Sequence, residues 1–345
     1  MLTNQRTVDL AGGATPIVAV DLRSASPPIA TLKQLETGLD TAPPWVTVAV
    51  VDGETPAHKR ITAIAERCDV VIADATDADS FGGVVVARTT VEDAMRQLTR
   101  AVEASPLAAV TLAQVLRCGA TLSIEQALYV ESTAYATLQT SERFMDFLAS
   151  QRPARGTDDD PRTLIERRDS LLHITLTRAA RRNALDTAMR DELTEAFELI
   201  DADDTLDGAL WTGEGPSFCA GGDLGEFGTT PSPAVGHHVR TIRSLPLMVH
   251  RVRDRLRVHL HGSCVGAGIE LPAFTHAVLA DPATTFCLPE VGFGLVPGAG
   301  GTVSVAQRCG RHRAGWLALT GEAIDVQTAL RWGLIDRIAE RRVAS

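Results

Sequence analysis

The chain has 345 residues, of which 45% are hydrophobic and 22% are charged, so disordered and fibrous classes are excluded. Forty-three acidic residues against 33 basic ones give a net charge of −10, which argues against nucleic acid or an anionic membrane as the main partner. No apolar run reaches the roughly 18 to 20 residues that a membrane helix needs, and the N-terminus lacks a signal-peptide pattern. We therefore expect a cytoplasmic protein that binds neither nucleic acid nor membrane.

Residues 1–91 alternate short β-branched runs with helical patterns, which is typical of an α/β layer. The predicted strands cover residues 17–22, 45–51 and 70–73, and the predicted helices cover residues 29–39 and 61–68.

Residues 92–152 differ from this layer, because apolar residues recur there at helical spacing. Helices are expected at residues 91–104, 106–117, 123–138 and 141–150, the last one capped by a hydroxyl group at Thr140 or Ser141. A polar segment with Pro, Gly and a run of Asp follows at residues 153–164, and we interpret it as a linker.

Residues 165–345 are predicted to form a second α/β unit. Strands are expected at residues 172–176, 208–212, 257–260, 277–280, 285–288 and 334–338, and helices at residues 187–201, 268–270, 302–309 and 323–333.

Three loops rich in small residues lie between these elements, at residues 213–222, 262–268 and 292–301. Small residues let a backbone come close to a ligand with its N–H groups bare. Two such turns can aim two N–H donors at one oxygen, which makes an oxyanion hole. One loop of this kind is a weak signal, but three at this spacing, two of them beside a glutamate, are a strong one.

The C-terminal part resembles the crotonase family, also called the enoyl-CoA hydratase/isomerase superfamily. The similarity spans roughly residues 168–340. Its motifs are Asn183-Ala184-Leu185, the F-C-A-G-x-D-L loop at residues 218–224, the Gly-rich loop at residues 262–271, P-E at residues 289–290, P-G-A-G-G-T at residues 297–302, and the segment from Gly321 to Leu334.

The resemblance implies a crotonase-like ββα spiral core and a set of site residues. The N–H groups of Gly222 and Ala267 would hold a thioester oxygen. Glu290 would deliver a proton to Cα, and Glu270 would activate the water that adds at Cβ. A coenzyme A thioester is then the substrate, with no metal or redox cofactor, and a homotrimer or a dimer of trimers is expected. Further residues expected to contact the CoA ester are Asn183, Ala184, Ala220, Gly221, Asp223, Leu224, Gly266 and Gly298.

Plainer interpretations exist for several of these residues. Glu270 could be a first-turn acid that interacts favourably with the dipole of its helix. Asp223 is expected to cap a helix rather than to take part in catalysis. His237-His238 is predicted to lie solvated in a polar loop, since no third metal ligand presents itself. The cysteines form no C-x-x-C pair and are predicted to be reduced core thiols, with Cys219 and Cys264 packing beside the oxyanion hole. They are Cys68, Cys118, Cys219, Cys264, Cys287 and Cys309.

The order of the parts is unusual for the family, whose members continue past the G-L-V element with further helices. Residues 105–108, 125–131 and 140–153 resemble those helices but precede the core. We interpret the chain as a tandem of two copies, the first keeping the helices and the second keeping the site. In the first of these helices the family often places a basic residue against the CoA phosphate, where this chain has Ala113-Gln114. Weaker CoA binding, or another arginine in that role, is therefore expected.

The predicted function is syn hydration of a 2-enoyl-CoA to a 3-hydroxyacyl-CoA. Other crotonase chemistry, such as double-bond isomerisation or C–C hydrolysis of a cyclic acyl-CoA, uses the same oxyanion hole and stays open, because a fold does not fix a function. A non-catalytic scaffold is the alternative from another class, and the presence of both glutamates argues against it.

Overall fold

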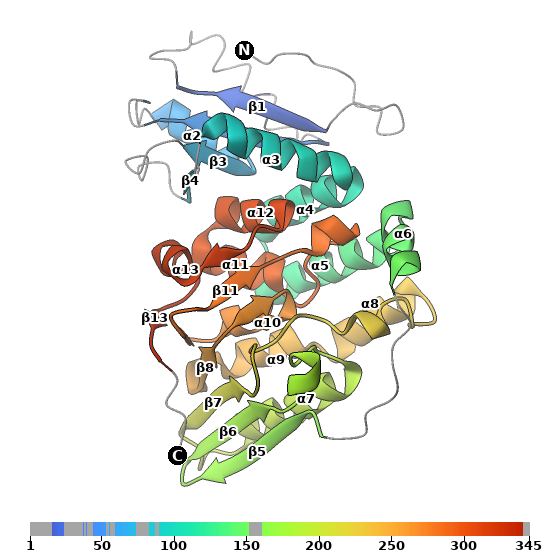
Figure 1. The fold of residues 1–345 in the computed structure, drawn as a ribbon, viewed down its shortest axis with the longest axis vertical. Helices are drawn as coiled ribbons and strands as arrows, with labels where there is room; N and C mark the ends of the chain where they lie inside the picture. The colour runs from blue at the N-terminus through green and yellow to red at the C-terminus, as the bar shows by residue number, and fades with distance from the viewer. Residues whose placement is uncertain are drawn as a thin grey trace.

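The structure is a computed structural model that describes residues 16–23, 37, 39, 44–52, 55, 59–73, 83–86, 90–151 and 161–340. In this part of the chain, strands form three sheets, and helices lie between the first sheet and the other two (Figure 1). No helix of the described part has the length and hydropathy to cross a membrane.

The N-terminal sheet is parallel, with its strands in chain order. Its inner strands are buried on both faces, as β-branched runs of a parallel sheet usually are. One face packs against helix α2 and the other joins the main core under α3, α4 and α12. The bounds are β1 Ile17–Asp21, β2 Val46–Val51, α2 Lys59–Arg67, β3 Val70–Ala73 and β4 Val85–Val86. The predicted helix at residues 29–39 lies almost wholly outside the described residues.

The predicted helical stretch is present, with bounds close to those expected. Ser141 caps the last helix by accepting a hydrogen bond from the Phe144 N–H. The helices are α3 Val91–Ala104, α4 Pro106–Gly119, α5 Ile124–Leu138 and α6 Glu142–Ser150.

These helices lie against the C-terminal core of the same chain. Helix α4 packs on α11 and α12, α5 packs on α8 and α11, and α6 lies beside the short 3₁₀ helix η6 (Figure 1). The tandem hypothesis requires this placement. The division of the chain at residues 91, 152 and 164 and the origin of its two parts stay predictions.

The C-terminal core holds a six-stranded sheet in the order β13-β10-β8-β7-β6-β5, parallel except for β5, and a three-stranded sheet in the order β12-β11-β9. Its strands are β5 Thr163–Arg168, β6 Leu171–Leu176, β7 Gly208–Gly213, β8 Leu256–Leu260, β9 Ser263–Val265, β10 Ala277–Ala280, β11 Thr285–Cys287, β12 Ile324–Asp325 and β13 Arg337–Ile338. Its helices are α7 Thr187–Ala202, α8 Pro233–Ile242, α9 Leu245–Val252, α10 Ala267–Glu270, α11 Gly301–Cys309, α12 Arg311–Thr320 and α13 Val326–Trp332, with η6 at Glu290–Phe293.

The sequence patterns did not predict α8, α9, α12, β4, β5, β9 and β12, and the helix expected at residues 323–333 begins only at Val326. The expected polar loop at His237-His238 is wrong, because both residues lie in α8, which Ser232 caps and Pro233 begins. Helix α12 is buried along most of its length, so it shows no apolar stripe for a periodicity argument to detect.

A buried ion cluster fixes the N-terminal sheet to both later parts of the chain. Asp69, which is 1% exposed, accepts hydrogen bonds from Arg117 of α4 at 2.8 and 2.5 Å and lies 3.6 Å from Arg311 of α12. It also accepts bonds from the Thr47 N–H and hydroxyl group at 2.8 Å. Since an unpaired buried charge is costly, this cluster holds the sheet, α4 and α12 in one arrangement.

Candidate active site

The first Gly-rich loop pairs with the residues after β6 like a short strand. The Leu185 N–H donates to the Gly221 carbonyl at 2.8 Å, and the Asp223 N–H donates to the Leu185 carbonyl at 2.8 Å. In a parallel bridge of this kind, the N–H of the middle residue, Gly222, points the other way. In the described part of the chain, this N–H makes no hydrogen bond.

The second loop brings another bare N–H to the same place. Ala267 is the first residue of α10, where backbone N–H groups have no partner within the helix. A bridge between Cys219 and Cys264, with the Val265 N–H donating to the Cys219 carbonyl at 3.1 Å, lays the two loops side by side. The geometry of two adjacent unpaired donors fits an oxyanion hole.

The close approach of the two loops depends on Gly268. A Cβ at this position would lie 2.1 Å from the carbonyl oxygen of Cys219, which belongs to the backbone and cannot rotate away. The sequence pattern of small residues is therefore a packing requirement here.

We expect Gly268→Ala to destabilise the fold by about 1–3 kcal/mol, because the added methyl group must push the loops apart. It should also lower activity by displacing the Ala267 N–H. Thermal unfolding and a turnover assay measure both effects. Gly292→Ala is the matched control, since a Cβ at Gly292 meets no atom within 4 Å. Equal melting temperatures for the two variants would contradict the packing argument.

Glu270, at the end of α10, is 2% exposed. Its Oε2 accepts hydrogen bonds from the N–H groups of Ala299 and Gly301, both at 2.8 Å. Burial raises the pKa of Glu270 to about 7, while the two N–H groups oppose the rise. This carboxyl group therefore titrates near neutral pH, where a general base is most effective.

Glu290 meets Glu270 at the turn that begins α10. A Cβ built on Gly266, whose φ is +50°, would lie 2.4 Å from Oε1 of Glu290 and 3.6 Å from Oε1 of Glu270. The Glu290 Oε2 is buried and has no hydrogen-bond partner in the described part of the chain. Burial, and then the charge of Glu270, raises the pKa of Glu290 well above its usual range. The two acids thus differ, with Glu290 holding its proton more tightly.

A third buried carboxylate, Glu131 of α5, reaches the same loop from the N-terminal helices. Its Oε1 accepts from the Gly300 N–H at 2.7 Å, and its Oε2 accepts from the Thr302 N–H at 3.0 Å and the Thr302 hydroxyl at 2.6 Å. The N–H groups at residues 299 and 301 therefore face Glu270, and those at residues 300 and 302 face Glu131. Burial, followed by the charge of Glu270, raises the pKa of Glu131 to about 8.

The sequence motifs assign no role to Glu131, although this residue ends the segment 125–131 that resembles a helix of the family. A signal was present, because Glu131 follows Ala127 and Leu128 on the buried side of α5. A glutamate on the apolar side of a helix is rarely buried without a partner.

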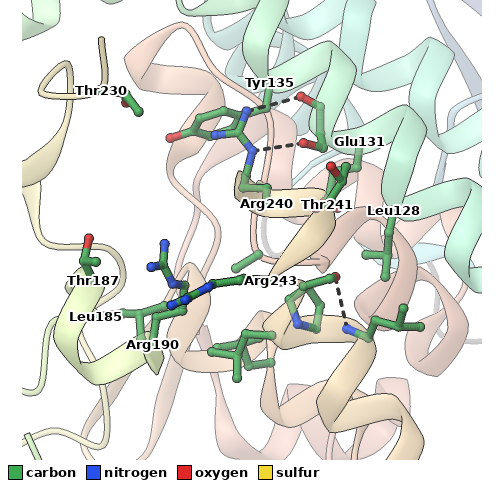
Figure 2. Close-up of a pocket in the computed structure, with 18 of the residues that line it drawn as sticks. Leu128, Glu131, Tyr135, Leu185, Thr187, Arg190, Thr230, Arg240, Thr241 and Arg243 are labelled. Carbon is green, nitrogen blue, oxygen red and sulfur yellow. Dashed lines mark hydrogen bonds between the residues drawn. The ribbon is translucent and has the colours of Figure 1, made fainter. Parts of the chain in front are cut away.

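A cavity of about 250 Å³ lies beside these groups. Glu131 and Ala299 line it, whereas Glu270 and Glu290 are not among its lining residues. Its wall is formed by α5, the start of α7, the segment from residue 226 to residue 247, and the loop at Gly298 and Ala299 (Figure 2). In this wall the guanidinium of Arg240 lies 4.6 Å from the centre of the Tyr135 ring. No sequence motif singles out either residue.

The predicted CoA-contacting residues have various structural roles. The Asn183 side chain is fully buried and holds the first loop by donating to the carbonyls of Glu214 and Ser217 at 2.9 and 3.0 Å. Asp223 caps the Gly225 N–H at 2.9 Å, as predicted, and pairs with Arg178. Asp223 and Gly298 line the cavity. Contact of the remaining residues with a CoA ester stays a prediction; they are Ala184, Ala220, Gly221, Leu224 and Gly266.

Neither the cysteines nor the histidine pair forms a reactive centre. All six cysteines are free and four are buried, but the predicted core position is wrong for Cys118, which is exposed. Burial raises the pKa of Cys219 to about 12 and that of Cys264 well above its usual range, as expected of packing thiols. His237 meets the Ser132 hydroxyl at 2.9 Å. No group of three metal-ligating side chains occurs among the described residues.

The family model described as enoyl-CoA hydratase/isomerase matches residues 166–344, which is more than half of the chain. The chain belongs to this family. Its C-terminal half has the α/β crotonase fold, and an extra α/β and helical region precedes it. The family therefore confirms the resemblance of the core, while the N-terminal region stays unassigned.

Two curated relatives illustrate the range of the family. The chain is 31% identical to mevalonyl-coenzyme A hydratase of Aspergillus fumigatus over 170 residues, which are 49% of this chain and 63% of that protein. It is 31% identical to 1,2-epoxyphenylacetyl-CoA isomerase of Escherichia coli over 174 residues, or 49% of this chain and 66% of that protein. The chain thus spans about two thirds of the length of the curated relatives it matches.

Among solved structures, the chain is similar to enoyl-CoA hydratase from Thermoplasma volcanium. The identity is 28% and the TM-score is 0.48, over 52% of this chain and 72% of the other. The oligomer that the resemblance implies stays a prediction.

Proposed function

We propose that this protein is an acyl-CoA enzyme that adds water to a 2-enoyl-CoA and forms a 3-hydroxyacyl-CoA. The observation that carries the proposal is the convergence of buried Glu270 and half-buried Glu290, which differ in proton affinity, beside two unpaired backbone N–H groups. Membership of the family supports a coenzyme A thioester as the substrate.

The N–H groups of Gly222 and Ala267 would hold the thioester oxygen. As water adds to Cβ, electron density moves toward that oxygen, and the two donors stabilise the enolate where its charge develops. Because both donors are fixed by loop packing, no reorganisation is needed during the reaction.

The two glutamates would divide the proton transfers. Glu270, which ionises near pH 7, takes a proton from the water while the water oxygen bonds to Cβ. Glu290, whose pKa is raised further, gives its proton to Cα. One water is consumed, and the proton gained by Glu270 then restores Glu290 through solvent.

Isomerisation of the double bond is the second candidate. The same pair could move a proton between Cα and Cγ without water, and the matching family model is described as enoyl-CoA hydratase/isomerase. Cleavage of a cyclic acyl-CoA is a third use of the same enolate. Glu270 and Glu290 argue against a scaffold without activity, since two neighbouring acids, one of them with an unpartnered buried oxygen, are costly unless they are used.

The test is a turnover assay with short, medium and bulky 2-enoyl-CoAs, beside a 3-enoyl-CoA. A hydratase removes the absorbance of the conjugated thioester and yields a product heavier by one water. Appearance of the conjugated ester from the 3-enoyl-CoA, without any hydrated product, would replace the proposal with isomerisation. If the protein shows no turnover and does not bind CoA esters, the scaffold is favoured.

A further inference from the structure

The cavity wall contains an arginine without an anionic partner. Arg240 of α8 donates from Nε to the Ser132 hydroxyl at 3.0 Å and from Nη2 to the Ser132 carbonyl at 3.4 Å. Within the described ranges, no carboxylate lies within 4 Å of its guanidinium, and its Nη1 makes no hydrogen bond. Burial lowers the pKa of Arg240, which reflects a positive charge removed from water.

The other two arginines of the cavity share one carboxylate. Arg190 and Arg243 both approach Oδ1 of Asp191, at 2.8 and 3.3 Å, and they lie together across the cavity from Arg240 (Figure 2). The acids of the wall are also engaged, since Glu131 binds backbone N–H groups and Glu226 binds the Thr187 N–H at 2.9 Å. Arg240 therefore differs from these groups in having no carboxylate within 4 Å, although the charge of Glu131 acts on it from farther away.

Arg240 stands one aromatic ring away from the reaction centre. Its guanidinium lies over the Tyr135 ring, at 4.6 Å from the centre. The same ring packs so closely on Gly298 that a Cβ there would lie 2.5 Å from it. Gly298 precedes Ala299, whose N–H holds Glu270. An acyl chain that enters the cavity beside Ala299 and passes Tyr135 would reach Arg240.

We propose that this cavity binds an acyl group carrying a carboxylate, with Arg240 as its cationic partner. The proposal rests on the proposed function and names its substrate class. A guanidinium with free N–H groups fits a carboxylate well, because the planar fork can donate two parallel hydrogen bonds.

Coenzyme A phosphate is the other source of anionic oxygen. A phosphate is strongly hydrated and favours the exposed arginine, Arg243, whose side chain is 62% exposed. Arg240 lies under α5, where a group attached to the acyl chain can reach it without carrying a hydrated diphosphate into the cavity.

The experiment compares two 2-enoyl-CoAs of equal chain length, one ending in a methyl group and one in a carboxylate. We expect the wild-type kcat/KM to favour the carboxylate, and Arg240→Met to lower kcat/KM for it about 10- to 100-fold more than for the methyl ester. Arg240→Lys should keep part of the preference. Arg243→Met is the matched control and should keep the ratio of the two substrates.

Equal kcat/KM values for the two substrates in the wild type would overturn the proposal. So would an equal loss on both in Arg240→Met together with weaker binding of free coenzyme A by calorimetry, which would place the guanidinium on a phosphate. If neither ester is hydrated, the proposed function fails. Calorimetry with the saturated esters then tests the site alone, and equal affinity for the two would overturn it.

Discussion

Glu290→Gln is expected to lower kcat by about 10²–10⁴-fold while the melting temperature stays close to that of the wild type. The amide has the shape of the acid but cannot give a proton to Cα. Because Oε2 of Glu290 has no hydrogen-bond partner in the described residues, the substitution breaks no contact of that oxygen. Loss of the conjugated thioester absorbance, followed at saturating substrate, measures the effect.

Glu142→Gln serves as the matched control, since this glutamate is exposed in the first turn of α6. The pH profile adds a second readout. Wild-type kcat/KM should rise as the pH passes about 7, where Glu270 ionises, and fall at higher pH as Glu290 loses its proton. The Glu290→Gln variant should lack the fall. Full activity in this variant would rule out Glu290 as the acid.

Glu131→Ala is expected to reduce both stability and turnover, although residue 131 lies far from Glu270 in the sequence. Removing the carboxylate leaves the buried N–H groups of Gly300 and Thr302 without acceptors, which costs about 1–3 kcal/mol for each group. The same turn carries the N–H groups that hold Glu270, so the base loses its fixed position. We expect kcat to fall by about 10²-fold, as small displacements in a reacting geometry often produce.

Glu131→Gln tests the raised pKa of Glu131 through the pH dependence of stability. In the folded wild type the pKa of Glu131 is raised from 4.5 to about 8, so folding favours the protonated carboxyl group. The stability that this group contributes below about pH 4.5 is therefore lost as the pH rises toward 8. A glutamine has no such loss. The free energy of unfolding of Glu131→Gln should therefore rise relative to that of the wild type between pH 5 and pH 9. A difference that does not change with pH would contradict the raised pKa.

Local motifs predicted the residues of the proposed site because the constraints on these residues are local. Gly266 and Gly268 are required by a positive φ and by a backbone contact, so the pattern of small residues marks the turn itself. The glutamates follow those turns at fixed positions. Amphipathic helices such as α3 were placed within a residue or two, because one face is buried and the other is not.

The groups that sequence reasoning missed come from contacts between distant segments. Glu131 meets Thr302 and Tyr135 meets Arg240 only after α5 has packed on the core. No spacing along the chain records such a meeting. Short strands such as β9, with three residues inside a Gly-rich loop, also lack the length that a pattern needs.

The clamp between α5 and the loop at residues 300–302 has a consequence for how the protein is made. Glu131 and Thr302 are 171 positions apart, so the clamp closes a very long loop of chain. At the usual pace of translation, about 10–30 s pass between the synthesis of the two segments. During that time α5 can pack on α4 but not on the C-terminal core, so we expect folding to finish only after the second segment is made and to be slow for the size of the chain.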